Sequence, residues 1–125
     1  MSAKTLTIPN AGAMSEFVHS FDVPSKLTDQ VYHCNFSHLW NGIATRHADT
    51  IDTKFFVDGR VVVVGLAHTA FAEFRERTGR DLTDREASYI AAEYLRERLE
   101  EEDEHALYDV PHDEVTRLIG RLKLS

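Results

Sequence analysis

Two apolar runs on either side of Asp58-Gly59 form the clearest pattern in the chain. Phe55–Val57 precedes the pair and Val61–Leu66 follows it. Asp-Gly between two β-rich runs is typical of a tight type I′ hairpin, because glycine adopts the positive φ that this turn requires. The second run does not alternate between apolar and polar positions, which is typical of a strand covered on both faces. The pattern therefore predicts a hairpin whose second strand is buried on both sides.

The residues before this hairpin alternate as half-buried strands do. Alternation over Glu16–Val23 and Gln30–Phe36 predicts two more strands. The short β-like run Thr5–Ile8 predicts either an edge strand or a loose arm within residues 1–15. Residues 37–50 fit a short helical turn or a connection into a strand that starts near Ile43.

From residue 67 onward the apolar spacing becomes that of helices. A first helix is predicted to end at Gly79, the residue that best adopts the left-handed conformation after a helix. Thr83 and Glu86 form a capping box that opens a second helix of about twenty residues. Pro111 precedes a last helix. In the second helix, a stripe of charged residues is expected to face water: Arg85, Glu93, Arg96, Glu97 and Glu100 to Glu104.

Strands followed by helices predict an α+β fold. We expect a single domain over residues 1–125, in which a mostly antiparallel sheet from the N-terminal half is packed by two or three C-terminal helices. Such a sheet normally leaves one face polar, whereas both strands of the hairpin are apolar on both faces. Something else should cover the second face: the N-terminal arm, the last helix, a ligand or a second copy of the chain. Two-fold homodimers are the commonest soluble oligomers, so we predict a homodimer.

Composition narrows the class of protein. The hydrophobic share of 42% is ordinary for a globular domain, and no apolar stretch is long enough for a membrane span or a secretory signal. With a single cysteine, these features predict a cytoplasmic protein without a membrane partner. The net charge is −7, and residues 67–104 hold twelve acidic and six basic residues. This acidic excess repels phosphate backbones, so neither a helix–turn–helix over 69–104 nor other nucleic-acid binding is expected.

Seven histidines raise the question of a metal site. Cys34 and His38 are four residues apart, as ligands on one helical turn would be, and His47 and Asp49 would share a strand face with Asp52 nearby. The chain lacks Cys-x-x-Cys and His-Glu-x-x-His, so ordinary hydrogen-bonding histidines fit the pattern better. We therefore expect no cofactor, and a metal-binding protein that uses residues 34–52 is the second alternative.

No catalytic motif stands out. Cys34 follows His33, but neighbours on a strand point to opposite faces, and the chain has no Gly-x-Ser-x-Gly or phosphate-binding loop. The leading hypothesis is a non-catalytic interaction or regulatory module that forms a homodimer through its apolar sheet or its long helix and binds a protein partner. The first alternative is a small-molecule-binding protein or enzyme with a pocket between sheet and helices. Its candidate ligand-binding residues are Tyr32, His33, Trp40 and His68.

Overall fold

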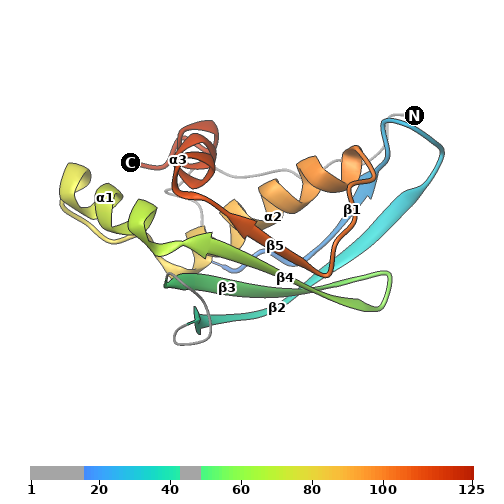
Figure 1. Cartoon of the computed structure of the whole chain (residues 1–125), viewed down its shortest axis with the longest axis horizontal. Helices are drawn as coiled ribbons and strands as arrows, with labels where there is room; N and C mark the ends of the chain where they lie inside the picture. Colours follow the sequence, from blue (N-terminus) through green and yellow to red (C-terminus); the bar gives the residue numbers. More distant parts are fainter. Residues whose placement is uncertain (1–15, 43–48) are drawn as a thin grey trace.

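The computed structural model describes residues 16–42 and 49–125, which form a five-stranded sheet and three helices (Figure 1). The strands are β1 (Ser20–Pro24), β2 (Val31–Gly42), β3 (Thr50–Val57), β4 (Arg60–Ala67) and β5 (Leu107–Val110). The helices are α1 (His68–Thr78), α2 (Asp84–Glu100) and α3 (His112–Arg121). The predicted α+β class is confirmed. None of the helices in the described residues is long and apolar enough to cross a membrane.

The sheet follows the chain, with the strand order β1-β2-β3-β4-β5. The first four strands pair antiparallel, and β5 pairs parallel to β4 after α1 and α2 have carried the chain back. In Figure 1, α2 lies along one face of the sheet with α3 beside it, while α1 extends from the end of β4. Sequence analysis did not predict β5, because a four-residue strand is too short to show a period.

The hairpin prediction is confirmed at the turn. Asp58 has φ 50° and Gly59 has φ 82°, the two positive values of a type I′ turn. The Asp58 carboxylate also accepts a hydrogen bond from the His33 backbone N–H at 3.0 Å, and its own N–H donates to the His33 carbonyl at 2.8 Å. The turn is therefore tied to the neighbouring strand β2.

Strand β2 is longer than the alternation predicted. It continues to Gly42 through a bulge between Phe36 and His38, so the helical turn considered after residue 37 is wrong in this part. The extra residue of the bulge shifts the alternation by one position, which hides the second half of the strand from a pattern search. The predicted Thr5–Ile8 strand and the strand start near Ile43 lie outside the described residues.

The core lies between the sheet and the helices. The other sheet face is open beside the hairpin turn, whereas Thr50 and Asp52 on the same face are buried. On β4, Val62 and Leu66 are buried under the helices, whereas Val61 is 49% exposed on the opposite face. The prediction that this strand is shielded on both sides is therefore wrong at Val61 for the single chain, while Gly65 on the same face is buried. β-Branched residues suit both faces of a strand, so a run of valines does not reveal which face is buried.

The helix ends follow local sequence. Gly79 has φ 82° and ends α1, and the capping box of Thr83 and Glu86 at the start of α2 is present in both directions. Helix α2 ends at Glu100, earlier than predicted, and the chain turns at Glu102, which has φ 57°.

One residue of the predicted solvent-facing stripe is buried. Glu93 is only 3% exposed, because Arg96 on α2 and Arg121 on α3 cover it and bind its carboxylate. Two arginines can hold a carboxylate away from water, which a helical pattern alone does not show.

Candidate functional site

The structure places the four predicted ligand-binding residues in different parts of the molecule. Tyr32 is fully buried on the helix side of the sheet, and its hydroxyl donates to Glu104 Oε2 at 2.8 Å. Burial, together with this carboxylate, raises the pKa of Tyr32 well above its ordinary range. Arg60 Nη2 donates to the same carboxylate at 2.9 Å. Tyr32 therefore anchors the segment between α2 and β5.

His33 and Trp40 lie on the opposite, open face of the sheet. The His33 Nδ1 atom is 2.9 Å from Asp22 Oδ1, and this hydrogen bond raises the pKa of the imidazole. Trp40 is 39% exposed, and its ring centre lies 5.2 Å from that of His38. His68 begins α1 at the end of β4. The four side chains do not share one pocket, and ligand binding by any of them stays a prediction.

The residues of the metal hypothesis are also dispersed. Cys34 and His38 lie on a strand rather than a helix, and the bulge between them leaves Cys34 in the core and His38 exposed. Asp52 is buried and accepts a hydrogen bond from Thr50 Oγ1 at 2.7 Å. His47 lies outside the described residues. Within residues 16–42 and 49–125, no group of three or more metal-ligating side chains forms.

The open sheet face carries an apolar strip. Strand register places Phe56 of β3 beside Val61 of β4, and Val63 of β4 beside Leu107 of β5. Val61 and Leu107 are about half exposed, at 49% and 47%, and Phe56 and Val63 are partly buried. We call Phe56, Val61, Val63 and Leu107 the apolar strip; Trp40 lies on the same face on β2.

Most ion pairs among the described residues lie on the helix layer and not on the face that carries the apolar strip. Ion pairs join α2 to α3 through Glu93 with Arg121 and through Glu97 with Arg117. Next to the apolar strip, the Lys54 ammonium lies 5.1 Å from the centre of the Phe56 ring. The helix layer is therefore rich in ion pairs, whereas the outer sheet face combines the apolar strip with charged residues such as Asp22, Lys54 and Asp109.

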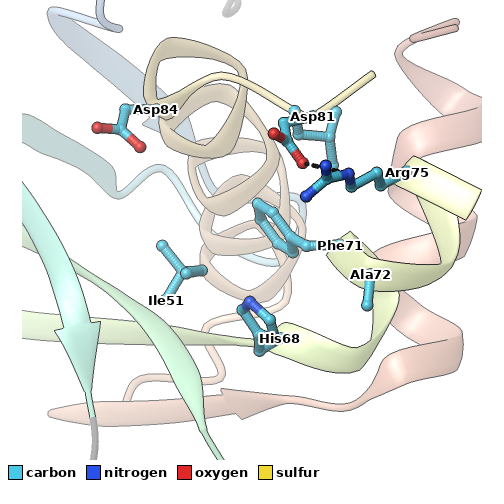
Figure 2. Close-up of a pocket in the computed structure, with 8 residues that line it drawn as sticks. Ile51, His68, Phe71, Ala72, Arg75, Asp81 and Asp84 are labelled. Atoms are coloured by element: carbon cyan, nitrogen blue, oxygen red, sulfur yellow. Dashed lines mark ion pairs between the residues drawn. The ribbon is translucent and has the colours of Figure 1, made fainter. Parts of the chain in front are cut away.

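A second feature is a hollow of about 260 Å³ where α1, the link to α2 and the start of α2 meet (Figure 2). Its apolar surface comes from Ile51, Phe71 and Leu82. The remaining lining residues are His68, Ala72, Arg75, Asp81 and Asp84. His68 is thus the one predicted site residue that lines this hollow.

A hydrogen-bonded cluster joins α1 to α3 nearby. Thr69 Oγ1 lies 2.9 Å from His112 Nδ1, and His112 Nε2 lies 3.1 Å from Glu73 Oε1. The order hydroxyl, imidazole, carboxylate is that of a hydrolytic triad. Thr69 and Glu73 are exposed, however, and the hollow of Figure 2 includes none of the three. The cluster ties the two helices together.

Sequence reasoning singled out three of the four residues of the apolar strip, within the runs 55–57 and 61–66, and missed Leu107. Of the residues that line the hollow, it named only His68 as a site residue. Positions 68, 71, 72 and 75 do share one side of a helix, a signal that could have found the α1 side of the hollow. The partners from β3 and α2 come from distant segments. Comparison of the chain with protein-family models, curated proteins and solved structures gives no significant match. The function of the chain is therefore inferred from its geometry.

Proposed function

We propose that the chain is an interaction or regulatory module that works in the cytoplasm as a homodimer, joined through the open face of its sheet. The observation that carries this proposal is the apolar strip, with Val61 49% and Leu107 47% exposed on neighbouring strands. A continuous exposed apolar patch is typical of a protein–protein contact. The free, buried Cys34 fits a reducing compartment.

The size of the face fits a dimer of modest affinity. Five strands about 4.8 Å apart, each contributing about six residues of 3.3 Å, cover roughly 480 Å². Two such faces would bury about 960 Å², near the lower limit of roughly 1,000–1,200 Å² for specific interfaces. We therefore expect association in the micromolar range of concentration.

The charge distribution favours a second copy of this chain as the occupant. A net charge of −7 opposes self-association unless the acidic surfaces stay apart. When two open faces meet, both helix layers point outward, and two sheets about 10 Å apart separate them. This separation is at least the Debye length of about 8 Å at physiological salt, so the repulsion is largely screened.

Sedimentation velocity between 1 and 100 μM tests the proposal. We expect a concentration-dependent dimer that Val61→Lys or Leu107→Lys converts to monomer, because each places a charge within the apolar strip. Leu27→Lys is the matched control: Leu27 is 61% exposed but lies in the turn between β1 and β2, away from the strip. A monomer at 100 μM, or a dimer unaffected by both strip variants, would contradict the proposal.

A further inference from the structure

We propose that the hollow beside His68 binds a small organic amine with an apolar body. This inference goes beyond the proposed dimer, because the hollow lies at the start of α1 and α2 and shares no residue with the apolar strip. If both proposals hold, the molecule combines a ligand site with an interaction face.

The hollow is built from three separate elements. Helix α1 starts at His68 directly after β4 and extends past the end of the sheet, and the chain then returns through residues 79–83 to α2. Figure 2 shows Phe71 in the middle of the site, with Ile51 to one side and His68 below it. Phe71 is partly buried, and Ile51 and Leu82 are nearly inaccessible. Phe71 therefore offers more apolar surface to the body of a ligand than Ile51 or Leu82 does.

Two polar groups of the hollow are free to bind. Among the described residues, neither the Asp84 carboxylate nor the His68 imidazole has a hydrogen-bond or ion-pair partner. Asp81, by contrast, has its Oδ1 atom 3.6 Å from Arg75 Nε, in an exposed ion pair. Asp84 can accept a hydrogen bond from an ammonium group, and an imidazole nitrogen of His68 offers a separate acceptor at the other end of the hollow (Figure 2).

The charge of the hollow selects a cation over an anion. Two carboxylates face one guanidinium, and the chain as a whole carries −7. The aromatic face of Phe71 adds an attraction for an ammonium group. A volume of about 260 Å³ admits a six-membered ring with a short aminomethyl arm. Because the site is small and partly open, we expect dissociation constants near the millimolar range.

The inference is tested by titrating isotope-labelled protein with three probes and measuring the amide chemical shifts by NMR at each step. Benzylamine, benzyl alcohol and benzoate share one ring and differ in charge. We expect benzylamine to shift amides of residues 68–75 and 81–84, with at least threefold tighter binding than benzyl alcohol and with no saturable binding of benzoate. Equal binding of benzylamine and benzyl alcohol, or amide shifts spread over the acidic surface, would overturn the inference.

A pair of matched variants tests whether the Asp84 carboxylate binds the amine. Asp84→Asn should weaken benzylamine binding at least threefold, whereas Asp113→Asn should leave it unchanged, because Asp113 is an acidic residue in the first turn of α3, outside the hollow. Equal affinity of the two variants would refute the role of Asp84. The Val61→Lys variant should still bind benzylamine, so the outcome of this titration is independent of the outcome for the dimer.

Discussion

Replacing Glu93 should destabilise the fold by removing the charge of a buried ion pair. Its buried carboxylate accepts hydrogen bonds from Arg96 Nε at 3.0 Å and from Arg121 Nε at 2.5 Å, and so joins α2 to α3. Glu93→Gln keeps the volume and removes the charge. Breaking a buried ion pair typically costs about 3–5 kcal/mol.

The surrounding charges place the expected cost near the lower end of that range. Arg96 retains Glu100, at 2.5 Å from its Nη1 atom, and Arg121 retains Glu97 at 3.7 Å, so neither guanidinium is left without a counter-charge. We therefore expect Glu93→Gln to lower the free energy of unfolding by about 3 kcal/mol. For a chain of this length, 1 kcal/mol corresponds to roughly 4 °C, so Tm should fall by about 12 °C.

Urea and thermal unfolding followed by circular dichroism measure this change. Glu114→Gln is the control, because Glu114 pairs with Arg117 at 2.9 Å in a partly exposed ion pair, whose loss should cost no more than about 1 kcal/mol. A loss below about 1 kcal/mol for Glu93→Gln would refute the reasoning that this buried pair holds the two helices together.

The same residue gives the stability a defined pH dependence. Burial raises the pKa of Glu93, but hydrogen bonds from Arg96 and Arg121 outweigh it and hold the pKa below its ordinary value. Because the folded-state pKa is the lower one, the stabilisation is complete above the unfolded-state pKa of about 4.3 and is lost as pH falls through the folded-state pKa. The difference in unfolding free energy between the native chain and Glu93→Gln should therefore be largest at neutral pH and shrink below about pH 4.

Further predictions concern four single residues. Burial raises the pKa of the Cys34 thiol to about 12, so a disulfide reagent at pH 8 should label it only after urea unfolds the chain. Thr83→Ala removes the capping box of α2 and should cost about 1 kcal/mol in urea denaturation. Gly59→Ala should cost about 1–2 kcal/mol at φ 82°, whereas Gly120→Ala in α3, with open space around its Cβ, should stabilise by up to about 1 kcal/mol in the same assay.

The features that sequence predicted well are those that adjacent residues determine. The Asp58-Gly59 turn, the end of α1 at Gly79 and the capping box of α2 each depend on backbone geometry within a few positions. Such signals do not need knowledge of the rest of the fold. The α+β class followed instead from the order of the elements, because strands in the first half of the chain are followed by helices in the second.

The candidate sites depend on contacts between distant segments, which the pattern of apolar and polar residues along the chain does not predict. Strand β5 completes the apolar strip with Leu107, yet it reaches its place beside Val63 only after the crossover through α1 and α2, which its own four residues do not reveal. The hollow likewise joins Ile51 of β3 to Phe71 of α1 and Asp84 of α2. Glu93 was expected in water because its neutralising partner Arg121 lies 28 residues further along the chain.

The sequence could not show which valines of β4 face the core and which face outward. One pair of variants tests the assignment that the structure gives. Val62 is buried against the helices, and Val61 faces outward on the same strand. Val62→Thr places a hydroxyl in the core and should lower the free energy of unfolding by about 1–3 kcal/mol. Val61→Thr should change it by no more than about 0.5 kcal/mol at a concentration where the chain is monomeric. Equal losses in chemical denaturation would show that both faces are buried within a single chain, and the apolar strip would then no longer be available to a second copy.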